Sequence, residues 1–314
     1  MALLARIYFN AVFGALGGLI GWLLFGVFGD PSTSDTRQWL LGGAIIGGGI
    51  GYFIVSVEAI RDQSLVRFCR LASYGVVLGA LGGAAGMWIG EAVNYQLVEW
   101  IGAGRDSWLA GAATMAARGL GWMFLGMAVG ISEGIAARSL GKLSYGTLGG
   151  ALGGFVGGAL FGGLYEWALR GTNPQDLVSA GGGAVGLVIL GACIGALTAL
   201  VQGVFQPASV RVLRGWQEGR EYPLVKVDTL LGRDEHADIA LFRDMRVEKR
   251  HAIIQRDNNR YVLINNHAPP EQTQVNGVSV AHVRDLHDGD RIQLGNIVLR
   301  FQLRAAQARA RKKT

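Results

Sequence analysis

Stretches of about 20 mostly apolar residues recur through the first two thirds of the sequence and limit what the chain can fold into. A helix rises 1.5 Å per residue, so a helix of that length crosses the bilayer's hydrocarbon core, which is about 30 Å thick. The first stretch is too long for the core of a signal peptide, and we expect it to be a retained span. The sequence therefore predicts an all-α membrane bundle of six helices, over residues 7–28, 38–57, 72–93, 111–132, 145–168 and 178–204.

The apolar stretches repeat as three pairs. The first members align without gaps as "YFNAVFGALGGLIG" from Tyr8, "SYGVVLGALGGAAG" from Ser73 and "SYGTLGGALGGFVG" from Ser144. The second members align on one glycine each, at Gly51, Gly126 and Gly195. Such regularity predicts a helical hairpin used three times and a pseudo-threefold arrangement of the bundle.

The run Gly-Ala-Leu-Gly-Gly occurs at residues 14–18, 79–83 and 150–154. A phosphate-binding loop needs its glycines in a turn between a strand and a helix, whereas these glycines lie inside apolar spans at four-residue steps. Small residues at that spacing share one helix face and let membrane helices approach closely. We therefore expect helix-packing glycines rather than a nucleotide site, at Gly14, Gly18, Gly79, Gly83, Gly150 and Gly154.

The basic residues between the spans predict the orientation of the bundle. If the N-terminus is cytoplasmic, nine Lys and Arg residues fall on the inner side, and four fall on the outer side, at Arg37, Arg105, Arg118 and Arg170. Cytoplasmic loops of membrane proteins are enriched in Lys and Arg. We therefore expect a multi-pass protein of the cell inner (cytoplasmic) membrane with both termini in the cytoplasm.

Three polar residues occupy equivalent positions near the expected cytoplasmic end of the bundle, at Glu58, Glu133 and Gln202. The two acids lie within a few residues of Arg61 and Arg138, which favours interfacial residues paired with arginines. The alternative is an ion pathway, because ionisable residues inside a bilayer are costly to bury. A channel or transporter regulated by the rest of the chain is thus one alternative function.

The sequence changes character after residue 204, and residues 205–314 carry all of the net charge of +6. Short β-type segments separated by turn signals such as Asn276-Gly277 predict an all-β sandwich. We expect a membrane domain over 1–204, a linker over 205–221, the sandwich over 222–303 and a basic tail over 304–314. The expected strands are "YPLVKV", "DIALF", "HAIIQR", "RYVLIN", "VSVAH", "RIQLG" and "NIVLRFQ".

This last region contains the successive motifs "LLGRDEHADIALF", "VEKRHAII", "YVLIN", "TQVNGVSV" and "LHDGDRIQLGNIVLRF". In this order they resemble the motifs of a forkhead-associated (FHA) domain. The resemblance covers Tyr222 to Leu303 and implies an eleven-stranded sandwich of a family that typically binds phosphothreonine peptides.

The resemblance also implies a binding site. Arg233 matches the arginine that contacts the phosphate, His251 matches a histidine that braces the binding loops, and Asn276 lies in a turn near the site. Glu248 stands where the family usually has a serine, and residues 270–273 replace the usual Thr-Asn-Gly-Thr. The expected phosphopeptide- or partner-binding residues are Arg233, Glu248, Lys249, Arg250, Glu271, Thr273 and Asn276.

The carboxylate of Glu248 opposes phosphate binding. A phosphothreonine carries about −1.5 to −2 charges at neutral pH. A carboxylate about 4 Å away opposes each unit charge by roughly 4 kcal/mol at an effective dielectric constant near 20. Lys249 and Arg250 offset part of this repulsion. We therefore predict weakened or absent phosphothreonine dependence, with a phosphothreonine-dependent signalling reader as the alternative.

The remaining residues favour an adaptor over an enzyme. The sequence contains no nucleophile paired with a base, no cofactor loop, and no cysteine or histidine spacing typical of a metal site. The basic tail lacks interleaved aromatics, which disfavours nucleic acid and favours the anionic inner leaflet. We expect a membrane-anchored scaffold without catalytic residues, metal or cofactor. It binds a protein in the cytoplasm or membrane, with a phosphoprotein as one alternative, and can form homo-oligomers.

Overall fold

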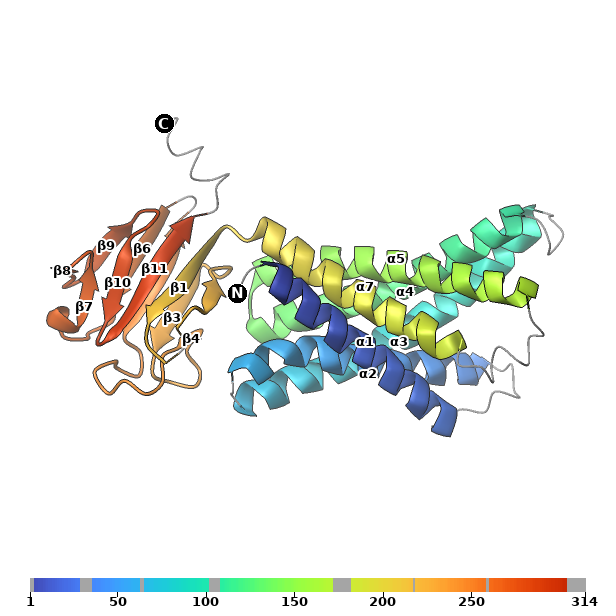
Figure 1. Cartoon of the computed structure of the whole chain (residues 1–314), viewed down its shortest axis with the longest axis horizontal. Coiled ribbons are helices and arrows are strands. Elements are labelled where there is room, and N and C mark those ends of the chain that lie inside the picture. Colours follow the sequence, from blue (N-terminus) through green and yellow to red (C-terminus); the bar gives the residue numbers. More distant parts are fainter. Residues whose placement is uncertain are drawn as a thin grey trace, which may run out of the picture. The chain divides into compact units, whose positions relative to one another are not determined.

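In the computed structural model the chain divides into two compact units, Ala2–Val204 and Phe205–Thr314. The structure describes residues 3–28, 36–62, 65–101, 108–171, 182–216, 218–257 and 260–303. The first unit consists of helices and the second of strands (Figure 1). The predicted fold class, a six-helix bundle followed by a β sandwich, is confirmed. The basic tail 304–314 lies outside the described residues.

Each predicted apolar stretch falls on one long helix, with residues 178–181 outside the described ranges. All six helices contain a segment long and apolar enough to cross a membrane. The helices run beyond the apolar stretches because polar residues at their ends still maintain the helical hydrogen bonds. Their bounds are α1 (Leu3–Phe28), α2 (Thr36–Asp62), α3 (Leu65–Ile101), α4 (Trp108–Ala137), α5 (Leu140–Gly171) and α7 (Gly182–Phe205).

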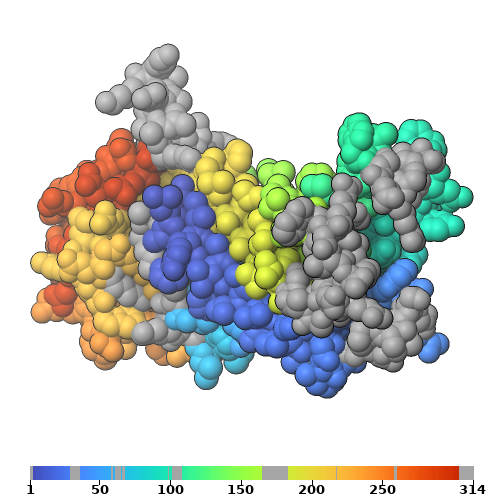
Figure 2. All heavy atoms as spheres, turned by 45° about the vertical axis from the view of Figure 1, so that its right-hand side comes forward, coloured from blue at the N-terminus to red at the C-terminus, as the bar shows by residue number. Residues whose placement is uncertain are grey.

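The helices contact one another in cyclic order. Helices adjacent in the chain pack together from α1 to α5. α5 then contacts α7 through Gly153 and Ile194, and α7 contacts α1 through Gly191 and Gly14. The space-filling view shows α1, in dark blue, beside α7, in yellow (Figure 2). The first and last helices therefore close the ring.

Every glycine expected to pack helices lies against the backbone of a neighbouring helix. A Cβ atom added at Gly14 would overlap the carbonyl of Gly191, and one added at Gly150 would overlap the carbonyl of Gly126. The same holds for the remaining contacts, which are Gly18 with Leu187, Gly79 with Gly47, Gly83 with Gly43, and Gly154 with Trp122. No side chain fits at these positions, because backbone atoms of the neighbouring helix already occupy the space.

Between the hairpins, two of the three interfaces share one register and the third is displaced. Gly14 meets Gly191 and the aligned Gly79 meets Gly47, but Gly150 meets Gly126, four residues beyond the aligned position. That aligned position holds Trp122, whose buried indole packs edge-on against Phe161. Gly150 therefore faces the next glycine, Gly126, while Gly154 lies against the Trp122 backbone, and α4 and α5 are displaced by about one helical turn.

Within the hairpins, all three interfaces share one register. Gly17 lies against Ile50, Gly82 against Leu125 and Gly153 against Ile194. The three apolar side chains occupy aligned sequence positions and are completely buried, each with 0% exposure. Ile50, Leu125 and Ile194 therefore form a packed apolar layer inside the bundle.

The second unit is a sandwich of two sheets (Figure 1). The strands of the six-stranded sheet lie in the order β2-β1-β11-β10-β7-β8, and those of the five-stranded sheet in the order β4-β3-β5-β6-β9. Their bounds are β1 (Ala208–Arg214), β2 (Glu221–Pro223), β3 (Asp228–Gly232), β4 (Ile239–Ala240), β5 (Ala252–Asp257), β6 (Arg260–Asn265), β7 (Thr273–Val275), β8 (Val278–Ser279), β9 (Val283–Leu286), β10 (Arg291–Leu294) and β11 (Ile297–Leu303).

The expectation of a linker over residues 205–221 was wrong, because β1 lies in that segment. β1 pairs antiparallel with β11, and its residues Val210 and Val212 are buried in the core. Only Gln206 and Pro207 separate the end of α7 from β1. Pro207 cannot continue the helix, so the chain passes almost directly from helix to strand.

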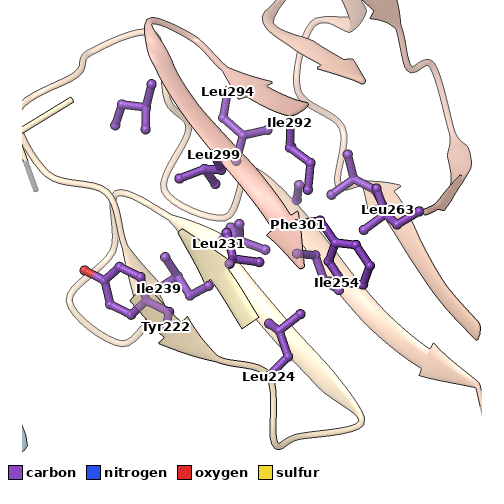
Figure 3. Packing of buried hydrophobic residues seen from close by; sticks show 14 of the residues in the cluster. Tyr222, Leu224, Leu231, Ile239, Ile254, Leu263, Ile292, Leu294, Leu299 and Phe301 are labelled. Carbon is purple, nitrogen blue, oxygen red and sulfur yellow. The ribbon is translucent and has the colours of Figure 1, made fainter. Parts of the chain in front are cut away.

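Large apolar side chains from both sheets fill the space between them (Figure 3). Phe301 on β11 packs against Tyr261 on β6, with ring centroids 5.2 Å apart. Leu231 and Ile254 enter the same core from the five-stranded sheet. Because residues alternate between the two faces of a strand, the intervening positions face outward, as exposed Arg300 does next to buried Phe301.

Candidate partner-binding site

The loop between β3 and β4 begins with Gly232 and Arg233, the pair singled out by the sequence. A Cβ atom at Gly232 would overlap the carbonyl of Lys249 in the loop between β4 and β5. This close approach allows the backbone N–H of Arg233 to donate to the backbone carbonyl oxygen of Glu248, with an N···O distance of 2.9 Å. The glycine therefore brings the two loops together and places Arg233 beside Glu248.

The side chain of Arg233 extends along the loop between β4 and β5. Its Nε–H donates to the carbonyl of Val247 at 3.2 Å, and its Nη1 lies 3.3 Å from the sulfur of Met245. The side chain is half-buried, whereas that of Met245 is exposed. Because a guanidinium has five N–H donors, these contacts fix its direction without using all of them.

Glu248, Lys249 and Arg250 follow Val247 in the loop between β4 and β5, and their side chains are exposed. Their carbonyl groups instead hold the loops together: the Arg250 oxygen accepts a hydrogen bond from Nδ2 of Asn266 at 2.8 Å. The tip of the loop thus presents one carboxylate and two cations to solvent. Asn266 was missed because an Asn-Asn pair after a strand indicates only a turn.

His251 braces the loops from inside the domain. Its Nδ1 accepts the backbone N–H of Glu248 at 3.0 Å, so its Nε2–H donates to Oγ1 of Thr273, also at 3.0 Å. Burial of the ring lowers the pKa of His251 from its usual 6.5. The neutral imidazole is the form that makes both bonds, since protonation of Nδ1 would remove the acceptor.

Thr273 was predicted to contact the partner, but its side chain is completely buried behind His251. The reason is pairing: Thr273 begins β7 and lies opposite Leu294 of β10, with its side chain facing the core. Thr273 therefore supports the loop indirectly. Glu271, in the 3-10 turn that precedes β7, is exposed and remains available at the surface.

Asn276 lies at the opposite end of β7 from Thr273. Its Nδ2 donates to Asp290 at 2.8 Å, and its Oδ1 accepts the backbone N–H of Arg291 at 2.9 Å. Its φ angle of 53° fits the turn between β7 and β8. Asn276 thus stabilises that turn, and the structure does not group it with Thr273.

Two further residues that the sequence analysis missed hold the loops in place. Asn265 donates through Nδ2 to the carbonyls of Ala268 and Val280, both at 2.9 Å, and fixes the start of the loop between β6 and β7. Asp244 accepts the backbone N–H of Asn296 at 2.6 Å, which joins the loop between β4 and β5 to the turn between β10 and β11. No local motif indicates the contacts of Asn265 with Val280 and of Asp244 with Asn296, because they join segments 15 and 52 residues apart.

The polar residues of the bundle form a second cluster. Gln202 donates through Nε2 to the carboxylate of Glu133, and its Oε1 accepts a hydrogen bond from Arg6 at 2.6 Å. Glu133 and Gln202 are both buried among the helices. The cluster joins α1, α4 and α7. The side chain of Glu58 lies outside the described residues.

Arg118 was expected in an outer loop but lies inside α4. Its Nη2 is 3.0 Å from the carboxylate of Glu91 on α3, and its guanidinium lies 5.7 Å from the ring centre of Phe161. An arginine is tolerated within an apolar span when an acid and an aromatic ring compensate its charge.

Among the described residues, no group of His, Cys, Asp and Glu could hold a metal ion.

Comparison with protein families identifies the second unit. Residues 211–305 match the family model described as "Inner membrane component of T3SS, cytoplasmic domain" (Yop-YscD). The matched segment begins within β1 and continues past β11, so it contains the core of the sandwich. With the two-sheet architecture, this match shows an FHA-like domain after six long apolar helices. No curated protein matches the chain significantly in sequence.

Several solved structures of FHA domains match about a third of the chain. One is an FHA domain studied for phosphothreonine-dependent interactions, with 28% identity and a TM-score of 0.29 over 31% of this chain and 97% of that chain. Another is the FHA domain of the Chlamydia trachomatis protein CT664, with 25% identity and a TM-score of 0.29 over 32% of this chain and 99% of that chain. A third is the FhaA FHA domain in a complex, with 28% identity and a TM-score of 0.28 over 30% of this chain and 99% of that chain.

Proposed function

We propose that this protein, with an FHA-like domain joined to six apolar helices, is a membrane-anchored adaptor that presents the loops of the domain to a protein partner. The site on these loops comprises Arg233, Glu248, Lys249, Arg250 and Glu271. FHA domains bind phosphopeptides and proteins, and we propose that phosphothreonine dependence is weak or absent in this one.

The observation that carries the proposal is the position of Glu248 beside Arg233. The Arg233 backbone N–H donates to the backbone carbonyl of Glu248, so the two residues are adjacent across the two loops. A phosphate bound by Arg233 would approach an exposed carboxylate, which opposes it by roughly 4 kcal/mol per unit charge at about 4 Å. A partner with hydrogen-bonding or mixed charged groups meets no such penalty.

The bundle supports an anchor rather than a conducting pore. Ile50, Leu125 and Ile194 are completely buried, and helix backbones touch on both sides of this layer. Close packing of this kind is what a rigid anchor requires, and it gives no support for a water-filled pore through the bundle. We propose that the glycine-mediated contacts are a glycine zipper that repeats in three hairpins. We also propose an inner-membrane location with both termini and the basic tail in the cytoplasm.

The proposed site can be tested on the full-length protein in detergent micelles. Fluorescence anisotropy would compare phosphothreonine peptides with the same peptides unphosphorylated. We expect the wild-type protein to bind both forms with affinities within about threefold, since less than 1 kcal/mol separates them. Replacing Glu248→Ser removes the repulsion and should raise phosphopeptide affinity by one to three orders of magnitude, that is, by about 1.4 to 4 kcal/mol.

The matched control is Asp285→Ser, which removes an exposed carboxylate from β9 and should leave both affinities unchanged. Micromolar binding by the wild-type protein that requires the phosphate and vanishes in Arg233→Ala would contradict the proposal. That result would instead establish a phosphothreonine-dependent signalling reader.

A further inference from the structure

The strand register places three arginines side by side on the six-stranded sheet. Arg211 on β1 lies directly opposite Arg300 on β11, and Arg300 lies directly opposite Arg291 on β10. All three side chains are exposed. Adjacent strands are about 4.8 Å apart, so the arginine row, residues Arg211, Arg300 and Arg291, spans about 10 Å across the outer face of the sheet.

Within the described residues, the three guanidinium groups form no ion pair or side-chain hydrogen bond. Glu221 lies opposite Arg211 on the edge strand β2, so an acid is near the row without pairing to it. The acids of the turn between β9 and β10 bind backbone groups: Asp288 accepts the N–H of Leu303, and Asp290 accepts that of His287. The row therefore keeps its positive charge free for a partner.

Like charges directly opposite each other destabilise a sheet. A row of three arginines on neighbouring strands therefore costs stability in the isolated domain. On the same face the row has uncharged neighbours in Gln293 on β10 and in Gln302 and Val298 on β11. Its charged neighbours are Glu221, opposite Arg211, and Arg214, opposite Val298. The positive charge thus predominates on the outer face of the six-stranded sheet, whereas Arg233 follows β3 of the other sheet.

We propose that the arginine row is a second docking surface, which binds an acidic segment of a protein partner. Each guanidinium offers a fork of donors that matches a carboxylate. Carboxylates spaced four residues apart on a helix lie about 5 to 6 Å apart, close to the spacing of adjacent strands. The face has no large apolar side chain of the kind that enters a bilayer, which favours polypeptide over lipid.

The test uses full-length protein in nanodiscs of uncharged phosphatidylcholine and a fluorescein-labelled decaglutamate peptide, with binding followed by anisotropy. The double variant Arg211→Gln/Arg300→Gln removes the centre of the row. Its matched control is Arg260→Gln/Arg284→Gln, which removes two exposed arginines from β6 and β9 of the other sheet. We expect the row variant to weaken binding at least about tenfold and the control to change it less than about twofold.

Equal weakening by both variants, or the absence of measurable binding by the wild-type protein, would overturn the proposal. Circular dichroism melting curves that are unchanged or shifted to higher temperature must accompany the expected result, which separates lost binding from lost folding. Vesicles that contain phosphatidylglycerol test the lipid source. One outcome is that these vesicles recruit nanodiscs of the wild-type protein but not those of the row variant, while all variants bind the peptide equally. That outcome would assign the surface to lipid and reject a protein partner.

Discussion

In the helical unit, backbones touch where side chains are missing, whereas in the sandwich large side chains hold the two sheets apart and fill the space between them. Gly14 lies against Gly191 because neither has a Cβ atom, while Phe301 lies against Tyr261 because both have rings. In lipid, burial of apolar side chains supplies no driving force between helices, so close backbone contact replaces it. In water, burial of apolar area stabilises the sandwich directly. The same density of packing thus arises from opposite residue choices.

The largest effect is expected from adding a side chain to the bundle. In Gly150→Leu, the new side chain overlaps the Gly126 backbone, which cannot withdraw from α5 without opening the interface. We expect a loss of more than about 3 kcal/mol and protease sensitivity of the helical unit in detergent. The matched control is Gly26→Leu, because a Cβ atom at Gly26 meets nothing within 4 Å. If both variants unfold at the same temperature, close backbone contact does not hold the bundle together.

In the sandwich, removing a buried side chain rather than adding one should be destabilising. Phe301→Ala removes a completely buried ring between the sheets and should cost about 3 to 5 kcal/mol. Urea-induced unfolding, followed by proteolysis within residues 208–303, measures the loss. Val283→Ala shortens an exposed side chain on β9 and should stay within about 0.5 kcal/mol of the wild type. A similar midpoint for both variants would show that the sandwich does not depend on its side-chain core.

A smaller effect is expected inside the sandwich at Thr273. Thr273→Val keeps the shape but removes the hydroxyl acceptor of the buried His251 Nε2–H and leaves only the backbone of Gln272 as a hydrogen-bond partner there, which should cost about 0.5 to 1.5 kcal/mol. In a His251→Leu background, the same replacement should cost less, since no donor is left unpaired. Equal costs in both backgrounds, measured by urea unfolding, would mean that the hydrogen bond contributes nothing to stability.

The smallest effect is expected from pH. Burial lowers the pKa of His251, so between the folded and unfolded pKa values the unfolded chain binds the proton more tightly. The stabilisation by the neutral ring is fully present above about pH 6.5 and is lost as the pH falls toward the folded pKa. Urea midpoints of the sandwich should decrease over that range in the wild type, and His251→Leu should lack this component. A wild-type midpoint that rises on acidification would exclude a depressed pKa.

The sequence contained most of the information needed for the bundle, because the determinants there are local. Glycines at four-residue steps identify a packing face within one helix, and Gly14 and Gly150 lie on such faces. The displaced register at Trp122 could not be derived in the same way. The register depends on which residues of α5 face α4. A repeat pattern does not contain this information, because it treats the three hairpins as equal.

The sandwich was predictable where its motifs are contiguous and not where strands distant in sequence pair. Gly232-Arg233 and His251 lie where the motif resemblance implied, but the burial of Thr273 follows from its pairing with β10. β1 was missed because seven residues after a long apolar helix give too short an alternation to stand out. The arginine row is invisible in the sequence, since Arg211 and Arg300 meet only through the register of the first and last strands.

The pairing of β1 with β11 has a consequence for the time course of biosynthesis. β1 emerges directly after α7, but its partner is synthesised only after strands β2 to β10. Until then, one side of β1 offers unpaired backbone groups, the kind of edge that attracts foreign strands. The nascent domain therefore passes through a vulnerable interval, and late closure by β11 is the step that ends it.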